Sequence, residues 1–414
     1  MLENVVEKSN DVCMIEGKPI SSFRIVYAQK PAGLEEAAQR LKTVVEACFG
    51  AVIECVCDTE DGVGNNEILI GKTNRAQSIR LYENEAPLLM SYRMAVEDGC
   101  LLIAPGGAFS AVAAVNALIE AWERGESLVW NEGLYPLVEM LSTSPVAMTE
   151  GSSLRVMTSN ILAHRWVSPN KRDLYPTVEQ RAEIYAANLA IYRPDIVGVQ
   201  ETDAPWLAHL PYYIELLKAQ YGLNYAWVFN QFDDVAIFTS MIFNKDRFTM
   251  VEGSCTEYPY VAPDVSARYK LRVLTQILLR DRNDGRLYAH FNTHSGGTND
   301  LVLGYEIPTM LAKMRELKAS YPNAIIFATG DFNNHGGTWY DIYKTATHLI
   351  DSREAAEKNG TLVNYLPGIP EQIYIDHAFT NLPAETVTRW ETVDHPYAKN
   401  LSDHRTQYGD YCIK

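Results

Sequence analysis

The second part of the chain, from Leu154 onward, alternates short apolar segments with longer segments of helical periodicity. β-Branched and aromatic residues dominate the short segments, which indicates strands buried in a sheet. The predicted strands are residues 154–160, 196–200, 236–244, 274–280, 286–293, 324–330, 373–380 and 406–411. Helices are predicted at residues 177–192, 206–221 and 307–320. Several of these strands end in a polar or charged residue, and rigid strand ends are where active-site residues commonly gather.

The first 145 residues predict a separate, small α+β domain. A chain of 414 residues exceeds the size at which a single hydrophobic core usually stops growing, so two domains are expected. A Thr-Glu-Gly-Ser-Ser run at 149–153 is typical of a linker. We therefore place an accessory domain at 1–145 and a second domain at 154–414. The expected elements of the first are strands at 22–27, 51–57, 67–70, 92–97 and 100–104, and helices at 33–49 and 110–124.

The segment Gly71-Lys72-Thr73 follows a predicted strand, as the lysine of a phosphate-binding loop would. That motif also needs an earlier glycine, and Asn66 stands in its place. The sequence therefore favours a strand-to-helix turn over a nucleotide site here.

The net charge weighs on the choice of substrate. The chain has 36 basic and 52 acidic residues, a net charge of −16. Nucleic-acid-binding surfaces gain affinity from clustered Lys and Arg, which this composition does not supply. A local basic groove could still bind nucleic acid, but the excess of acidic over basic residues favours a small phosphorylated substrate.

The sequence also bears on location. It contains no run of ~18 apolar residues, so no membrane-spanning helix is expected. We see no signal peptide at the N-terminus, and the seven scattered cysteines do not form a disulfide framework. We expect a cytoplasmic protein with no obligate protein partner.

Three polar residues at or just after predicted strand ends of the second domain are candidate site residues. Asn160 closes the first strand, although a strand-end Asn alone is usually a turn former. Glu201 follows a buried strand and Gln200, which places a hard oxygen ligand suited to Mg²⁺ at the strand's mouth. His294 ends a strand just before a Ser-Gly-Gly loop, whereas His290, inside that strand, is expected to be structural.

Three further segments complete the set. Asp331 and Asn333 lie two residues apart in Gly-Asp-Phe-Asn, so in an extended segment they face the same side. Asp376 lies on the strand Ile-Tyr-Ile-Asp-His-Ala-Phe, and Asp403-His404 forms a charged step before the last strand.

In this order the six segments resemble the endonuclease/exonuclease/phosphatase superfamily, whose members include DNase I-like nucleases, phosphatases and deadenylases. The resemblance covers residues 154–414. It implies a four-layer α/β/β/α sandwich of two packed sheets. It also implies a divalent-metal-dependent phosphoester hydrolase that uses Mg²⁺, or Mn²⁺ in its place.

The resemblance also assigns roles. Glu201 is implied as the principal metal ligand, with Asn160 and Asp403 beside the metal and Asn160 also near the substrate. Asp331 would activate or position the attacking water, and Asn333 would contact the phosphate.

The remaining implied roles concern the phosphoryl group. His294 would contact the scissile phosphate and protonate the leaving oxygen. His404 would stabilise the phosphoryl charge, and Asp376 would accept a hydrogen bond from His404 and fix its ring. His335 stays open as a further substrate contact.

Differences from the motifs of individual branches of this superfamily narrow the range of expected substrates. Leu162 stands where abasic-site endonucleases have an Asp, which disfavours a repair nuclease. Inositol-polyphosphate phosphatases extend the Gly-Asp motif with Tyr-Arg and have a Cys-Asp-Arg strand. The matching stretches here are Asn333-Asn334-His335 and Ile375-Asp376-His377, which disfavours that branch as well. The stretch at 22–124 is similar to the small N-terminal domain of family 20 hexosaminidases, a resemblance that transfers no catalytic residue.

The sequence is compatible with three functions. The favoured one is hydrolysis of a small phosphorylated or phosphodiester substrate by metal-assisted, in-line attack of water. The alternative is a nuclease or deadenylase acting on single-stranded nucleic acid. A scaffold with a dead site is disfavoured, because every acid, amide and histidine of the six motifs is intact.

Overall fold

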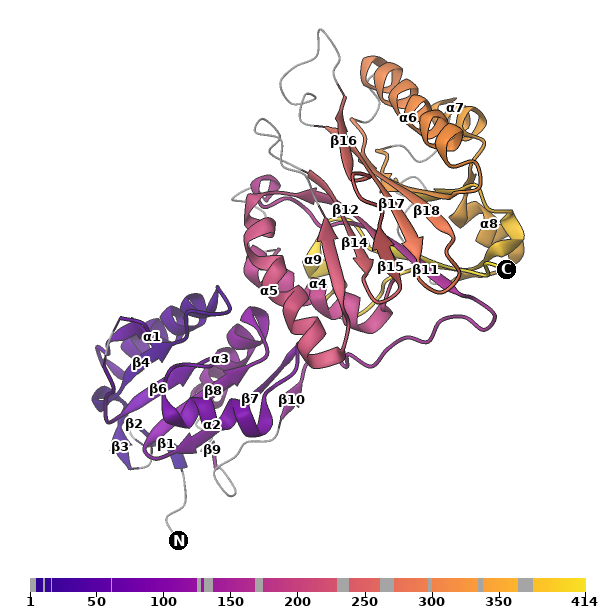
Figure 1. Cartoon of the computed structure of the whole chain (residues 1–414). Helices are drawn as coiled ribbons and strands as arrows, with labels where there is room; N and C mark the ends of the chain where they lie inside the picture. Colours follow the sequence, from indigo (N-terminus) through magenta and orange to yellow (C-terminus); the bar gives the residue numbers. More distant parts are fainter. Residues whose placement is uncertain are drawn as a thin grey trace. The chain divides into compact units, whose positions relative to one another are not determined.

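The computed structural model describes residues 5–9, 12–15, 17–60, 62–124, 128–129, 137–167, 174–228, 238–260, 272–296, 300–333, 338–363 and 375–414. The chain divides into two compact units (Figure 1). Unit 1 comprises Met1–Ser144 and Pro176–Ile191, and unit 2 comprises Pro145–Tyr175 and Tyr192–Lys414.

Unit 1 contains a six-stranded sheet with strand order β10-β7-β8-β6-β4-β5. Strands β4, β5, β6 and β8 are parallel, and β7 pairs antiparallel with β8. These strands are β4 (Arg24–Tyr27), β5 (Cys55–Cys57), β6 (Glu67–Ile70), β7 (Ser91–Glu97), β8 (Cys100–Pro105) and β10 (Val138–Glu139). A four-stranded sheet, in order β3-β2-β1-β9, consists of β1 (Val5–Ser9), β2 (Val12–Ile15), β3 (Lys18–Pro19) and β9 (Leu128–Val129).

The helices of unit 1 follow from its sequence pattern. Helix α1 (Leu34–Phe49) buries the apolar stripe of Leu34, Ala37, Leu41 and Val45 against the six-stranded sheet. Between β6 and α2 (Ala76–Glu85), the Gly71-Lys72-Thr73 segment forms a strand-to-helix turn as predicted, with Gly71 at φ 85°. The hairpin of β7 and β8 turns at Asp98-Gly99, where both residues have positive φ.

Helix α4 (Val178–Tyr192) belongs almost entirely to unit 1, although it lies between two strands of unit 2 in the sequence. Its buried Glu183 accepts hydrogen bonds from the main-chain N–H groups of Phe109 and Ser110, at 2.7 and 3.0 Å. These two amides belong to the first turn of α3 (Ala108–Glu123). The carboxylate therefore satisfies donors that a helix N-terminus leaves free.

Unit 2 contains two seven-stranded sheets. The first, here called the Asn160 sheet, has the order β13-β14-β12-β11-β24-β23-β21. Its strands are β11 (Leu154–Asn160), β12 (Ile196–Thr202), β13 (Tyr225–Val228), β14 (Phe238–Asn244), β21 (Leu362–Val363), β23 (Val387–Thr392) and β24 (Gln407–Tyr411). Strands β11 and β12 are parallel, so Asn160 and Gln200 end up opposite one another.

The second, the Asp331 sheet, has the order β15-β17-β18-β19-β22-β20, and β16 also pairs with β17. Its strands are β15 (Phe248–Met250), β16 (Thr256–Pro259), β17 (Val273–Asp281), β18 (Leu287–His294), β19 (Ile325–Asp331), β20 (Ile350–Asp351) and β22 (Asp376–Thr380). Strands β18 and β19 are parallel and place His294 opposite Asp331, while antiparallel β22 places Asp376 on the other side of Asp331.

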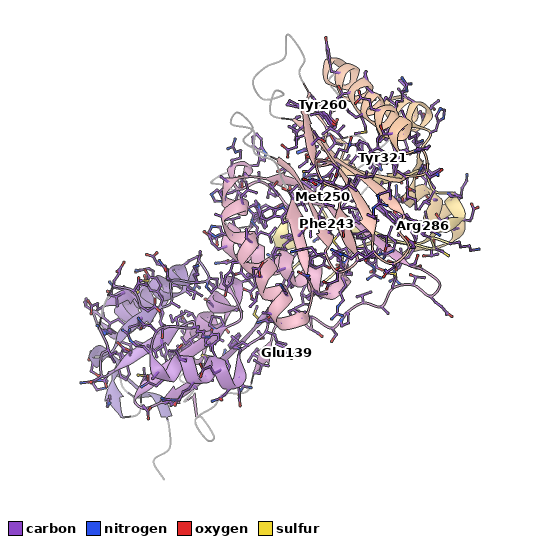
Figure 2. All side chains as sticks on the ribbon, viewed as in Figure 1. Glu139, Phe243, Met250, Tyr260, Arg286 and Tyr321 are labelled. Atoms are coloured by element: carbon purple, nitrogen blue, oxygen red, sulfur yellow. The ribbon has the colours of Figure 1, made fainter. Side chains whose placement is uncertain are left out.

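The two sheets of unit 2 pack face to face over a buried core. Leu154, Val156 and Ile196 of the Asn160 sheet meet Ile277 and Phe327 of the Asp331 sheet in one cluster. Phe243 belongs to the same cluster and the partly buried Met250 packs against it; both are labelled in Figure 2. Burying this apolar surface is the main stabilising contribution expected of such a sandwich.

Helices cover the outer faces of the sandwich. Helix α6 (Asp300–Ser320) packs Ile307, Met310 and Met314 against the outer face of the Asp331 sheet, together with Tyr343 of α7 (Thr338–Thr347). Helix α5 (Ala204–Tyr221) lies beside the Asn160 sheet (Figure 1). The remaining helices are α8 (Ser352–Asn359) and α9 (Ala398–Leu401). The predicted fold class, two packed sheets with helices outside and a small α+β unit before them, is confirmed.

The two sheets of unit 2 pack closely against each other just before the strand ends that carry Glu201 and His294. A Cβ on Gly198 would lie 1.9 Å from the Thr329 hydroxyl oxygen, so only glycine fits there. The Gln200 amide donates to Asn292 Oδ1 at 2.6 Å, and the Asn292 amide donates to the Ser240 carbonyl at 2.8 Å. These bonds join the two sheets, so the residues above them sit on a rigid base.

In the part of the chain that the structure describes, no helix is long and apolar enough to span a membrane. The predicted cytoplasmic location stays a prediction.

Candidate active site

Four predicted site residues lie at or next to the ends of adjacent strands. Asn160, His294 and Asp331 are the last residues of β11, β18 and β19. Glu201 lies near the end of β12 and has a left-handed backbone, with φ 62°. A positive φ is rare for a residue with a side chain and is common at functional sites.

The carboxylates of Glu201 and Asp331 converge on one amide. Asn160 Nδ2 donates to Glu201 Oε1 at 3.1 Å and to Asp331 Oδ2 at 2.9 Å. Asn160 Oδ1 accepts from the Leu162 N–H at 3.0 Å, and the Ala163 N–H donates to Glu201 Oε2 at 2.8 Å. The backbone after β11 thus holds both the amide and the acid in place.

Burial dominates the electrostatics of this pair. Glu201 is 8% exposed and Asp331 is 1% exposed. Burial raises the pKa of Glu201 above its usual range. Burial, together with the nearby Asp376 carboxylate, raises the pKa of Asp331 to about 7.

His294 faces the same two acids. Its Nε2 lies 3.3 Å from Asp331 Oδ2 and 3.8 Å from Glu201 Oε1. Burial holds the pKa of His294 well below its usual range, so the ring is neutral at neutral pH. His290, further down β18, bonds Thr329 inside the sandwich, consistent with the predicted structural role.

Asp376 and His404 form a hydrogen-bonded pair on the other side of Asp331. His404 Nδ1 lies 2.8 Å from Asp376 Oδ2, and His404 Nε2 lies 3.6 Å from Asp331 Oδ2. Burial alone would lower the pKa of His404, but the Asp376 carboxylate outweighs it and raises that pKa to about 10. The ring is therefore a cation at neutral pH.

Asn333 is turned toward the loop after β18. It has a positive φ of 49°, its N–H donates to Asp331 Oδ1 at 2.8 Å, and its side-chain amide donates to the Ser295 carbonyl at 2.8 Å. Its Oδ1 is the side-chain atom left to meet a substrate.

Asp403 is exposed, and its charge raises the pKa of Glu201. It does not join the two groups of close donor atoms found among the described residues. Its place at the rim therefore differs from that of the buried acids. His335 lies outside the described residues.

The donor atoms fit a divalent cation. Glu201, His294 and Asp331 each offer a ligand atom, and these atoms lie within 4.8 Å of one another; Asp331, Asp376 and His404 form a second such group. Burying several carboxylates together is costly unless a positive charge compensates them. The oxygen-rich set matches the ligands that Mg²⁺ and Mn²⁺ prefer.

Three solved structures with a similar fold give a comparison. A mannosyl-6-phosphatase of Bacteroides thetaiotaomicron has 20% sequence identity and a TM-score of 0.49, and the match covers 62% of this chain and 98% of that one. An endonuclease/exonuclease/phosphatase from Bacteroides vulgatus has 20% identity and a TM-score of 0.49, over 62% and 97% of the two chains. The catalytic domain of human Nocturnin has 17% identity and a TM-score of 0.48, over 64% and 95%.

The chain is similar to endonuclease/exonuclease/phosphatase proteins. No protein-family model and no curated protein matches the sequence. The likeness concerns the fold alone, so the function of this chain is inferred from the arrangement of its site residues.

The sequence did not predict the groups that fix the site residues by hydrogen bonds. The Ala163 N–H, which binds Glu201, is a backbone group that carries no sequence signal. Ser295 was noticed only as part of a Ser-Gly-Gly loop, and Glu306 was not singled out at all. Glu306 precedes the helix predicted at 307–320, so the apolar stripe of that helix gave no signal for it.

Proposed function

We propose that the chain is a divalent-metal-dependent phosphoester hydrolase that acts on a small phosphorylated or phosphodiester substrate by in-line attack of water. One observation carries this proposal. Asp331 lies between a buried acid–histidine group, Glu201 and His294, and an imidazolium, His404, that Asp376 holds in place. A site of this kind combines anionic metal ligands with a fixed positive charge for the phosphoryl group.

The proposed metal is Mg²⁺, with Mn²⁺ as a substitute. Glu201 would be its principal ligand, with Asn160 and Asp403 beside it. When bound, the metal would neutralise charge on the non-bridging oxygens of the phosphoester. The remaining chemistry belongs to the side chains of the chain itself.

Asp331 is the proposed acceptor for the proton of the attacking water. It is the residue closest to all the others: Asn160, His294 and His404 each have a nitrogen within 3.6 Å of its Oδ2. A buried carboxylate held on several sides keeps one orientation, which general-base catalysis requires.

The two histidines would serve the phosphoryl group in different ways. His404, a cation at neutral pH, would stabilise the negative charge that develops on the phosphoryl oxygens. His294 is neutral, so it would contact the scissile phosphate as a hydrogen-bond donor. To protonate the leaving oxygen, it would first take up the proton that Asp331 accepts from the attacking water, since Asp331 Oδ2 lies 3.3 Å from His294 Nε2. Asn333 would contact the phosphate.

A nuclease or deadenylase is the second candidate, and one observation favours it. The turn η3 (His164–Trp166) directly follows Ala163, whose N–H binds Glu201. It exposes two basic residues and a tryptophan beside the site. Cationic and aromatic side chains together are suited to a single-stranded backbone and its bases. The net charge of −16 weighs against an extended nucleic-acid surface.

A substrate panel tests both proposals. We would measure Mg²⁺- and Mn²⁺-dependent product release from p-nitrophenyl phosphate, bis-p-nitrophenyl phosphate, sugar phosphates, single-stranded RNA and plasmid DNA. Turnover of the small esters, abolished in Asp331→Ala and His404→Ala, supports the first proposal. Turnover confined to RNA, and reduced in Arg165→Ala, supports the second. Full activity in Asp331→Ala contradicts both.

A further inference from the structure

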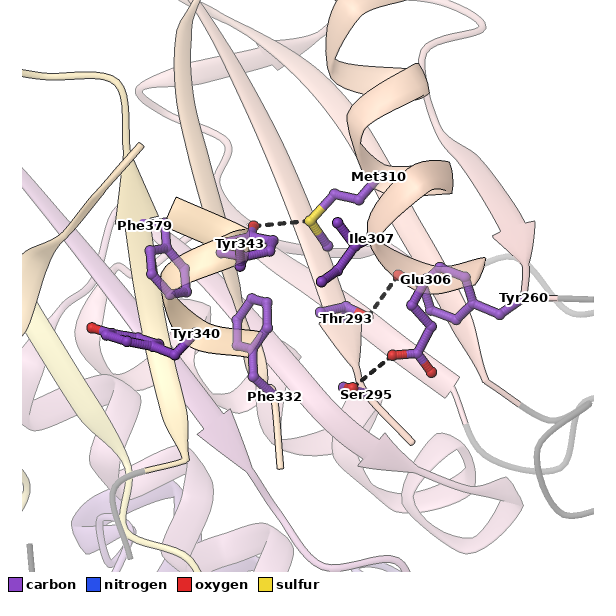
Figure 3. Close-up of a pocket in the computed structure, with 10 residues that line it drawn as sticks. All are labelled: Tyr260, Thr293, Ser295, Glu306, Ile307, Met310, Phe332, Tyr340, Tyr343 and Phe379. Carbon is purple, nitrogen blue, oxygen red and sulfur yellow. Dashed lines mark hydrogen bonds between the residues drawn. The ribbon is translucent and has the colours of Figure 1, made fainter. Parts of the chain in front are cut away.

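A buried glutamate on α6 holds the loop that follows His294. Glu306 is 4% exposed. Its Oε2 accepts a hydrogen bond from the Ser295 hydroxyl at 2.6 Å (Figure 3). Its Oε1 accepts one from the Gly296 N–H at 2.9 Å. Both carboxylate oxygens are therefore bonded to consecutive residues of one loop.

That loop is connected to the proposed catalytic residues by its main chain. The Ser295 N–H donates to the Asp331 carbonyl at 2.8 Å. The Ser295 carbonyl accepts from the Asn333 side-chain amide at 2.8 Å, and the Asn333 N–H donates to Asp331 Oδ1 at 2.8 Å. Glu306 thus acts on Asn333 through a single intervening residue.

The surroundings of Glu306 are poorly suited to a carboxylate. It lines a small cavity of about 30 Å³ together with Ile307, Met310 and aromatic side chains that include Tyr260 and Phe332 (Figure 3). Burial raises the pKa of Glu306 to about 7. An apolar side chain at this position would avoid the free-energy cost of burying a carboxylate. The contribution that an acid makes here and an apolar residue could not is the pair of hydrogen bonds to the loop.

We propose that Glu306 is a positioning residue: by fixing Ser295 and Gly296, it sets where Asn333 presents its side chain beside Asp331. The proposal rests on the proposed phosphoester hydrolysis. Asn333 has a left-handed backbone, which its neighbours must hold in place. Loss of the Ser295 anchor would free the Asn333 amide and misplace its oxygen relative to the substrate.

The test compares three variants on the same helix. Glu306→Ala removes both hydrogen bonds. Glu306→Gln keeps an acceptor for the Gly296 N–H and gives the Ser295 hydroxyl an amide donor. Glu316→Ala is the matched control, because Glu316 is exposed and its carboxylate bonds Lys313, away from the loop after His294. We would measure kcat and KM on the best small ester of the panel, together with the melting temperature.

The expected result is a tenfold or greater loss of kcat in Glu306→Ala, recovery to within about threefold in Glu306→Gln, and no change in Glu316→Ala. Because Glu306 would act through Asn333, Glu306→Ala should cost little more in an Asn333→Ala background. A merely structural role would give additive losses instead. Wild-type kcat in a folded Glu306→Ala, or additive losses in the double variant, would overturn the proposal.

A second measurement separates this proposal from the proposed function. Hydrogen–deuterium exchange at the main-chain amides of Ser295, Gly296 and Asn333 reports the anchoring without any turnover. Exchange should be faster in Glu306→Ala than in Glu316→Ala. If the wild type hydrolyses no phosphoester, the proposed function fails and this exchange alone decides the anchoring. If Glu306→Ala does not fold, both measurements use Ser295→Ala, which removes only the hydrogen bond of the hydroxyl group. Unchanged exchange and unchanged kcat in Ser295→Ala would contradict the proposal.

Discussion

His404 Nδ1 lies 2.8 Å from Asp376 Oδ2, and this contact aims the other ring nitrogen of His404 at Asp331, 3.6 Å away. Asp376 and Asp331 sit opposite one another on the antiparallel pair β22 and β19. The sheet register therefore fixes both acids relative to one imidazole. A cation held in this way needs little reorganisation when negative charge develops next to it.

Asp376→Asn should lower the pKa of His404 and reduce kcat by tenfold or more, because the amide no longer compensates the buried cation. The direction in which stability changes with pH follows from the raised pKa of His404 in the folded protein. Stability contributed by the His404 charge is fully present below pH 6.5 and is lost as the pH rises through about 10. The metal-free wild type should therefore lose stability across that window, and the variant should lose less.

Nuclear magnetic resonance titration of His404 and melting temperatures from pH 6 to 11 measure these effects. Asp394→Asn, at an exposed acid, is the control. A His404 pKa unchanged by Asp376→Asn would show that the pair is not the source of the shift.

Metal binding should strengthen as the pH rises through about 7. Burial and Asp376 raise the pKa of Asp331 to about 7 in the metal-free protein, so below that pH the protonated carboxyl adds no negative charge beside the metal. Isothermal titration with Mn²⁺ from pH 5.5 to 8 should show affinity increasing with pH. Asp331→Asn should flatten the dependence, and an equally steep dependence in that variant would show that protonation of Asp331 does not oppose metal binding.

Glu201→Gln should weaken Mn²⁺ binding by tenfold or more, because it removes the charge of the proposed principal ligand while keeping the shape of the side chain. Glu215→Gln, on the exposed side of α5, is the matched control and should bind Mn²⁺ like the wild type. Equal affinity in the two variants would exclude Glu201 as a metal ligand.

Gly198→Ala should destabilise unit 2 by about 1–3 kcal/mol or more, because the new methyl group would overlap the Thr329 hydroxyl where the sheets approach each other. Gly304→Ala is the opposite control. No atom lies within 4 Å of a Cβ on Gly304, which lies in α6, so it should stabilise by about 0.5–1 kcal/mol. Denaturant unfolding of both variants measures the difference. If Gly198→Ala were as stable as the wild type, the two sheets would have to accommodate the methyl group without any loss in the free energy of unfolding.

The sequence predicted Asn160, His294 and Asp331 at strand ends, and the structure places them there, while their roles stay predictions. An apolar strand that stops at Asn160 or Asp331 is visible as a break in pattern, and parallel pairing then brings such ends together. The left-handed backbone of Glu201 and the hydrogen bond from Ala163 to it could not be predicted in this way, because they depend on tertiary packing.

Short and irregular elements also escaped prediction. Strands such as β13 and β16 have four residues each, too few to show an alternating pattern. Helix α6 was predicted to begin at residue 307 and begins instead at Asp300. Pro308 caused that error, because proline usually marks a first helical turn, whereas here it lies inside the helix.

The most direct test of the proposed chemistry is hydrolysis of bis-p-nitrophenyl phosphate and p-nitrophenyl phosphate by metal-stripped protein, before and after addition of Mg²⁺ or Mn²⁺, beside Asp331→Asn prepared in the same way. We predict no product without metal, turnover when metal is restored to the wild type, and at least a hundredfold lower rate in Asp331→Asn. Turnover that persists in excess chelator, or equal rates in the wild type and Asp331→Asn, would contradict the account.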